Sequence, residues 1–285
     1  MELSTGYVAA FGGVTILAML IAHRILRRIL SPSATPRAEL LGDNRAHALR
    51  ETGDVLAVFL VGAAVVKNCV HGESLSTDAI WCAAFASLGL LLLEVTGHLG
   101  LLLLFSRSLK ASLDRGNVAA GAAAGAHYVA TGLLTSRAVA GSDLRGIGLS
   151  LVFFALAQVV HQLLVAAFRM LTTYDDAEQI EGENLAAAIS YAGVSLAVAT
   201  IVARALEGDF VDWPHAIAGF GLLSATAFGL YPVRQLLVQS LVLGGRPSIR
   251  GGDLDVAIAR DRNVGVAALE ATSYIGTAAA VAMLA

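Results

Sequence analysis

The chain has few charged residues. Asp, Glu, Lys and Arg make up 14% of its 285 residues, hydrophobic residues make up 56%, and the mean hydropathy is +0.72. Soluble domains carry about 25% charged residues. The composition therefore excludes an ordinary soluble protein. The net charge of −3 is also small, and opposite charges are interspersed in most connections, so a nucleic-acid partner is not indicated.

Motifs for catalysis and metal binding are missing too. The sequence holds no H-E-x-x-H, C-x-x-C or P-loop pattern, and its seven histidines are scattered, whereas a metal site needs three or four convergent ligands. No Ser/His/Asp arrangement or nucleotide-binding fingerprint stands out. We therefore expect a protein that is not an enzyme and that holds neither a metal nor a cofactor.

Cysteine is rare. Cys69 and Cys82 flank the connection between the second and third apolar segments, and they could close a small loop by a disulfide if that side of the membrane is oxidising. Buried, unpaired thiols that pack as small hydrophobic groups are the alternative that we favour.

A cleavable signal peptide is not evident. The first residues, MELSTGY, lack basic side chains, and the first basic cluster follows the first apolar segment. This order predicts a signal anchor whose N-terminus lies outside.

Long apolar segments are what the chain has in abundance. We expect eight transmembrane helices, at residues 6–27, 53–70, 79–105, 117–136, 147–168, 185–204, 214–242 and 264–284. Each segment is much longer than a barrel strand and lacks the alternation of lumen-facing and lipid-facing residues. The fold class is therefore all-α, in a multi-pass protein whose first partner is the lipid bilayer.

Basic residues predict the orientation. Most of the 19 Lys and Arg residues, Arg37 and Arg107 among them, lie in the connections that follow the odd-numbered spans or at the helix ends beside them. Basic residues near helix ends resist translocation, so these connections are expected in the cytoplasm and both termini outside. Tyr7, Trp81 and Trp213 open three odd-numbered spans, as expected of aromatic residues at the outer interface.

A repeated pattern divides the chain. Four times, an apolar segment and a short charged stretch are followed by an asparagine that opens a second run of small residues; these are Asn44, Asn117, Asn184 and Asn263. Such self-similarity indicates a copied two-helix unit. All four copies would share one orientation, which gives parallel repeats in two four-helix halves, residues 1–141 and 142–285.

The asparagine pattern resembles a bacterial inner-membrane family called domain of unknown function 350. The best matches are NVAAGAAAGA from Asn117 and NLAAAISYAG from Asn184, whereas the runs from Asn44 and Asn263 match less well. Members typically have four spans, so the resemblance implies a tandem fusion that covers essentially the whole chain. It also implies a location in the bacterial cytoplasmic membrane and, by analogy, a homo-oligomer, but no catalytic residues.

Polar side chains follow the asparagines on the same helix face. Glu51, Tyr191 and Glu270 each lie seven residues after an asparagine, or two helical turns. The asparagines can be explained as helix N-caps alone, and Glu51 as a side chain that reaches the nearby interface. The functional interpretation is a polar stripe facing an aqueous path, because an unpaired carboxylate within a span is costly.

A glutamate and a histidine share one face of the third span. Glu94 and His98 are four residues apart. Such a pair could relay protons or could form a helix-to-helix hydrogen bond that orients the bundle.

These patterns favour a conduit for a small ion or polar solute. In this hypothesis Glu51, Glu94, His98, Tyr191 and Glu270 line or gate the path, and the four asparagines close its cytoplasmic mouth. The alternative is a scaffold that transports nothing and acts in a stress response through a cytoplasmic or membrane partner protein.

Overall fold

A computed structural model describes residues 5–30, 41–72, 74–104, 109–208, 210–248 and 250–285. Arg37, Arg107 and the end of the third expected span at residue 105 lie outside these ranges. The described residues form helices and no strand, so the all-α prediction is confirmed.

The long helices are α1 (Thr5–Leu30), α3 (Arg45–Cys69), α4 (Leu75–Leu104), α6 (Val118–Ala138), α7 (Leu144–Arg169), α9 (Leu185–Arg204) and α13 (Val264–Leu284). An eighth long segment combines α10 (Trp213–Ala225), η1 (Thr226–Gly229), α11 (Leu230–Pro232) and η2 (Val233–Val242). The short helices are α5 (Leu109–Asp114), α8 (Asp176–Glu181), α12 (Asp253–Asp255) and η3 (Val256–Arg260).

Six helical segments among the described residues are long and apolar enough to cross a membrane; they are Gly6–Ile29, Leu75–Leu102, Leu144–Arg169, Leu185–Arg204, Trp213–Val242 and Val264–Leu284. The other two expected spans fall on α3 and α6. Helix α3 is more polar because it carries Arg50, Glu51 and Asp54, and α6 is rich in alanine and glycine. The protein is thus a helical membrane protein, and spans at α3 and α6 stay predictions.

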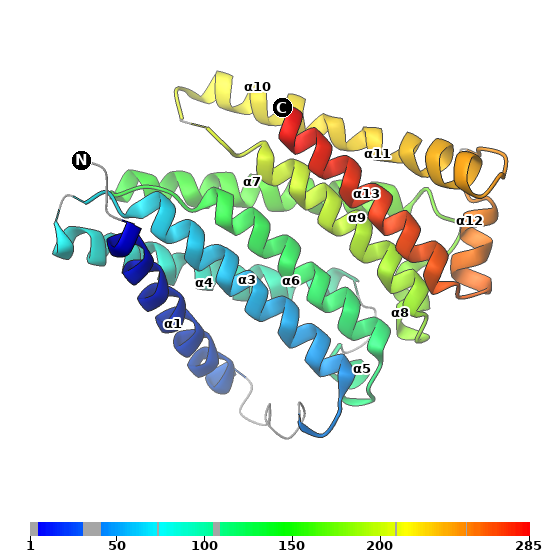
Figure 1. The fold of residues 1–285 in the computed structure, drawn as a ribbon, viewed down its shortest axis with the longest axis horizontal. Coiled ribbons are helices and arrows are strands. Elements are labelled where there is room, and N and C mark those ends of the chain that lie inside the picture. Colours follow the sequence, from blue (N-terminus) through cyan, green and yellow to red (C-terminus); the bar gives the residue numbers. More distant parts are fainter. Residues whose placement is uncertain (1–4, 31–40, 73, 105–108, 209, 249) are drawn as a thin grey trace.

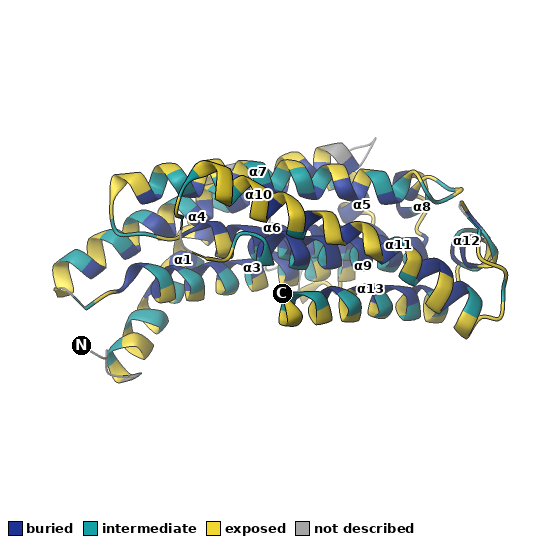
Figure 2. Cartoon of the chain, turned by 90° about the horizontal axis from the view of Figure 1, so that it is seen from above, coloured by how far each residue is buried: buried dark blue, intermediate teal, exposed yellow. Residues whose placement is uncertain are grey.

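The helices form an inner row and a set of outer helices. Helices α3, α6, α9 and α13, which we call the inner row, lie side by side in sequence order (Figure 1). Helix α4 packs on α3 and α6, α7 packs on α6 and α9, and the α10–η2 segment packs on α9 and α13, so each covers one seam of the row. Buried residues concentrate along the row (Figure 2).

Small residues allow the inner helices to approach closely. A Cβ atom added to Gly53 would lie 2.2 Å from the carbonyl oxygen of Gly125, and one added to Gly193 would lie 2.4 Å from the Cα atom of Ala271. Close backbone contact of this kind is the usual way in which helices associate in lipid.

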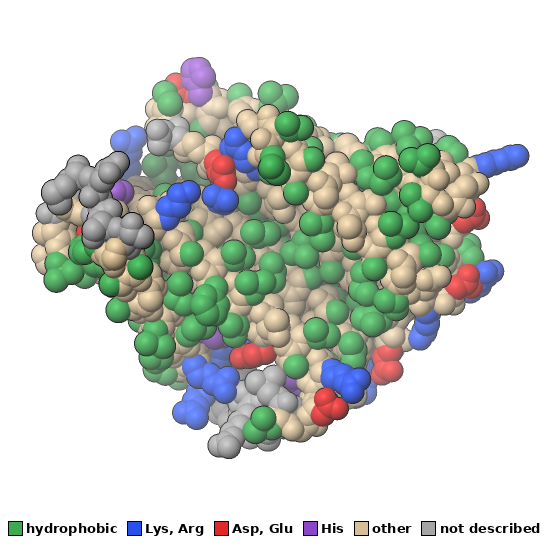
Figure 3. All heavy atoms as spheres, viewed as in Figure 1, with side chains coloured by type: hydrophobic (Ala, Val, Ile, Leu, Met, Phe, Trp, Pro, Cys, Tyr) green, Lys and Arg blue, Asp and Glu red, His purple; other side chains and the backbone are tan. Residues whose placement is uncertain are grey.

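The surface agrees with a membrane setting. In Figure 3, hydrophobic side chains spread over the middle of the visible face and charged side chains gather near its margins. The connections α5, α8 and α12 lie at one end of the bundle, and both chain ends lie toward the other (Figure 1). Which end faces the cytoplasm stays a prediction.

Both cysteines are free thiols. Cys69 and Cys82 are buried, and the Sγ atom of Cys82 lies 3.2 Å from the hydroxyl of Thr15. The prediction of unpaired, buried thiols is confirmed.

Candidate functional site

All four repeated asparagines are helix N-caps. Their side-chain oxygens accept hydrogen bonds from backbone N–H groups at the starts of α3, α6, α9 and α13. This satisfies amide groups that would otherwise be unpaired at each helix start. The capping interpretation of Asn44, Asn117, Asn184 and Asn263 is therefore confirmed.

Three of the asparagines also link one helix of the row to the connection that follows it. The Nδ2 group of Asn44 donates to the carbonyl of Leu113, at 2.9 Å. In the same way Asn117 donates to Ile180 and Asn184 to Ile258, each at 2.9 Å. Sequence reasoning missed this second bond. The signal was the choice of asparagine, because serine, threonine and aspartate can cap a helix but carry no amide donor.

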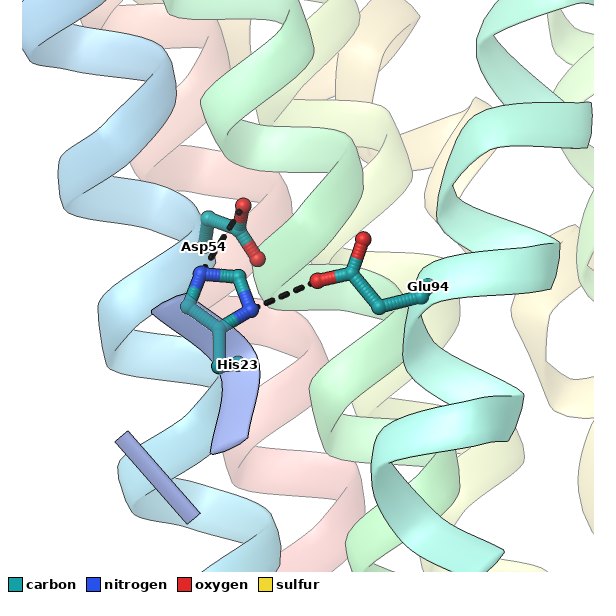
Figure 4. A group of neighbouring side chains, drawn as sticks. All are labelled: His23, Asp54 and Glu94. Atoms are coloured by element: carbon teal, nitrogen blue, oxygen red, sulfur yellow. Dashed lines mark ion pairs between the residues drawn. The ribbon is translucent and has the colours of Figure 1, made fainter. Parts of the chain in front are cut away.

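A group of three ionisable side chains lies in the first half, at the contact of three helices. His23 on α1 is placed between Asp54 on α3 and Glu94 on α4 (Figure 4). The Nδ1 atom of His23 lies 2.6 Å from a carboxylate oxygen of Glu94, and its Nε2 atom lies 3.6 Å from one of Asp54. The three residues are 2%, 0% and 8% exposed. Burial of this degree within a helical membrane protein is costly and marks a candidate site.

Arginines surround Asp54. The Nη1 atom of Arg27 lies 2.5 Å and the Nη2 atom of Arg50 lies 3.3 Å from its Oδ2 atom. The guanidinium of Arg50 also stacks over the ring of Tyr128, 5.1 Å from the ring centre. Glu51, one turn before Asp54, contacts Arg27 at 3.8 Å and is partly exposed.

The arginines of this group balance its carboxylates when His23 is neutral. It holds three carboxylates, Glu51, Asp54 and Glu94, and three guanidinium groups close to them, those of Arg24, Arg27 and Arg50. A proton on His23 or a bound cation would add positive charge to this neutral group. Ligand atoms of His23, Asp54 and Glu94 all lie within 4.8 Å of one another, so these three residues could hold a metal ion.

The second half contains a different charge group. The Nε group of Arg234 donates to the Oε1 atom of Glu270 at 2.6 Å, and the same guanidinium donates to Asp255. Ser190 donates its hydroxyl proton to the other oxygen of Glu270 at 2.6 Å. Glu270 is 1% exposed. Its carboxylate is therefore paired and buried in a structural network.

A small cavity adjoins Glu270 and is lined in part by Tyr191, Arg234 and Asp176. Asp176, on α8 outside the apolar segments, receives a hydrogen bond from the Nε group of Arg169 at 3.1 Å. Burial raises the pKa of the Asp176 carboxyl to about 7, although Arg169 opposes the shift.

The structure separates the predicted path residues into two places. Glu51 and Glu94 belong to the His23 group, and Tyr191 and Glu270 lie at the cavity in the second half. His98 is exposed on α4, and Glu94 pairs with His23 instead of with His98. Glu94 and His98 share a face of α4, but this does not make them a buried pair. Which residues of a helix are buried depends on the helices that pack against it.

The chain belongs to a family without an assigned function. It matches the family described as Domain of Unknown Function (DUF350) over residues 2–139 and again over residues 142–285. The suspected membership and the tandem arrangement are thereby confirmed. No curated protein and no solved structure matches the chain.

Proposed function

We propose that the protein is a conduit for a small cation, and that the proton is the cation that fits best. The observation that carries the proposal is the buried position of His23 between Asp54 and Glu94. Imidazole can gain and lose a proton near neutral pH, and two carboxylates on opposite sides of the ring can deliver and accept it.

An entry to this group lies at the Asn44 end of α3. The side chain of Glu51 is 19% exposed and that of its partner Arg24 is 45% exposed. Asp54 follows Glu51 by three residues on the same helix, so carboxylates lead inward from the surface to His23. Glu94 on α4 then takes up the proton beyond the ring.

The nearby arginines favour a proton over a divalent metal ion. Because Arg24, Arg27 and Arg50 already balance the three carboxylates, a proton on His23 adds a single positive charge. A divalent ion would leave an excess of two positive charges in a buried place, which costs more free energy than one proton does. Arg27 and Arg50 also already contact the Oδ2 atom of Asp54.

Proton flux into vesicles tests the proposal. The purified protein is reconstituted in liposomes that contain a pH-sensitive dye, and a potassium gradient with valinomycin drives the flux. We expect flux for the unmodified protein and at least a tenfold loss for His23→Gln and Glu94→Gln. His98→Gln is the matched control, because His98 is an exposed histidine on α4, and it should keep the flux. Equal proton flux into vesicles with and without the protein would overturn the proposal.

A scaffold is the second candidate function. It is favoured by the network around Glu270, in which Arg234 and Ser190 occupy both carboxylate oxygens in the manner of a structural link. A scaffold would show no flux in the vesicle assay and would copurify with a stoichiometric cytoplasmic or membrane partner protein.

A further inference from the structure

The inner row is open at both ends. The row has three junctions, and at each one an inner helix packs on the next inner helix in chain order. These junctions are α3 with α6, α6 with α9, and α9 with α13. Within the part of the chain that the structure describes, no inner helix packs on the side of α13 away from α9, and exposed residues run along α13 at Ala268, Thr272, Gly276 and Ala279. On α3, Thr52, Leu56 and Phe59 are exposed.

The asparagine bonds form a series that stops at α13. Asn44, Asn117 and Asn184 each donate an Nδ2 hydrogen bond forward, to the connection that precedes the next inner helix. Asn263 caps α13 through its side-chain oxygen, but its Nδ2 group has no partner among the described residues. In the described part of the chain, Asn263 thus lacks the forward bond that the other three asparagines make.

The first and last internal junctions share a register that is counted from the asparagines. Gly53, nine residues after Asn44, packs on Gly125, eight after Asn117. The last junction repeats the same pair of positions, with Gly193 on Ala271. At the open ends, the corresponding residues are Thr272 on α13 and Thr52 on α3, and both are exposed.

Two further register positions concern glycines. Gly121 packs on Ala46 and Gly132 packs on Ala57, so the positions two and thirteen residues after Asn44 receive the next helix. The same positions on α13 are Gly265 and Gly276. Nothing lies within 4 Å of a Cβ atom placed on Gly276.

The register also places a large side chain opposite Gly276. Gly132 lies fifteen residues after Asn117, and the equivalent residue of α3 is Phe59, which is 44% exposed. A second copy continuing the row would thus set Phe59 over Gly276. A large side chain opposite a glycine suits close helix packing.

Helix α1 lacks one of its two expected neighbours. Helices α4 and α7 and the α10–η2 segment each lie across two inner helices, whereas α1 packs on α3 of the inner row and on α4. It is also the least buried of the apolar spans. A second copy would place its α13 beside α1 and complete the same arrangement.

We propose that a second copy of this chain continues the inner row, with α13 of one copy against α3 and α1 of the next. The contact is head to tail, so it leads to a closed ring or an open array and not to a two-fold dimer. It rests on the continuity of the three internal junctions and does not depend on proton transport.

Cysteine crosslinking in membranes tests the register. Thr52→Cys and Thr272→Cys are combined in a chain in which Cys69 and Cys82 are replaced by alanine, and mild oxidation is applied. We expect crosslinked species at multiples of 29.4 kDa for the double variant and none for either single variant. Crosslinking of Thr272→Cys alone would show a symmetric contact and would overturn the head-to-tail arrangement.

A variant at Gly276 tests the packing. Gly276→Leu should convert the assembly to a 29.4 kDa monomer in nanodiscs by mass photometry, with thermal unfolding unchanged. Gly148→Leu is the matched control, because Gly148 is also an exposed helical glycine with nothing within 4 Å of its Cβ position, and it should leave the assembly intact. An unmodified protein that is monomeric at every concentration would overturn the proposal.

Asn263→Asp gives a second, independent variant. Aspartate keeps the capping oxygen and lacks the Nδ2 donor. We expect the self-association constant to fall at least fivefold. An unchanged constant would contradict the role of the forward bond.

Discussion

The guanidinium of Arg234 and the carboxylate of Glu270 form a buried ion pair between η2 and α13, with the Nε atom 2.6 Å from Oε1. The side chains are 3% and 1% exposed. This pair fixes the last outer segment onto the last inner helix. The carboxylate that the sequence suggested for an ion path is therefore engaged by a partner from the neighbouring helix.

Glu270→Gln should destabilise the protein strongly. Removal of one member of a buried ion pair leaves the other poorly compensated, at a cost of about 3 kcal/mol or more. Thermal unfolding in detergent measures the loss. Asp261→Asn is the control, since its pair with Arg260 is exposed, and it should leave unfolding unchanged. A change at Glu270 as small as that of the control would show that Arg234 is satisfied without it.

Asp176 should make stability depend on pH. Its folded-state pKa is about 7 and its ordinary value is 3.8, so the folded protein binds more protons between these values. Stability is then lost as the pH rises from about 4 to about 7, by up to about 4 kcal/mol. Unfolding midpoints of the unmodified protein and of Asp176→Asn, measured at several pH values, should diverge in this window. Parallel curves would contradict the raised pKa.

Asn184→Asp should be much more harmful than Asn263→Asp. Both changes keep the cap, but at Asn184 the carboxylate would be buried against the carbonyl of Ile258, which now accepts a hydrogen bond. The lost bond and the unsatisfied carbonyl cost roughly 2 kcal/mol or more. Asn263 makes no such bond, so the monomer should unfold as before. The free energy of unfolding is measured with urea. Equal losses of this free energy in the two variants would show that both asparagines act only as helix caps.

Gly53→Ala should disrupt the first junction of the inner row. The new methyl group would lie 2.2 to 2.5 Å from backbone atoms of Gly125, so α3 and α6 must separate. Overpacking of this kind costs about 1 to 3 kcal/mol. Gly148→Ala should be neutral or slightly stabilising, because it adds a good helix former in open space. Thermal unfolding measures the effect. If Gly53→Ala leaves the unfolding temperature unchanged, α3 and α6 can separate at little cost.

Local sequence determined that the protein lies in lipid, which segments are helices and where the inner helices begin. Long apolar runs can be satisfied in lipid only as helices, and an asparagine before a run of small residues caps a helix whatever lies beside it. The small residues of these runs also let helices approach closely.

Only the tertiary structure decided how the charges pair. His23, Asp54 and Glu94 come from three helices, and Asn117 reaches the carbonyl of Ile180 in another connection. Helical periodicity tells which residues share a face of one helix, as Glu94 and His98 do, but not which helix that face meets. Electrostatic pairing depends on distances of a few ångströms between helices, and these arise only when the inner row and the outer helices pack together.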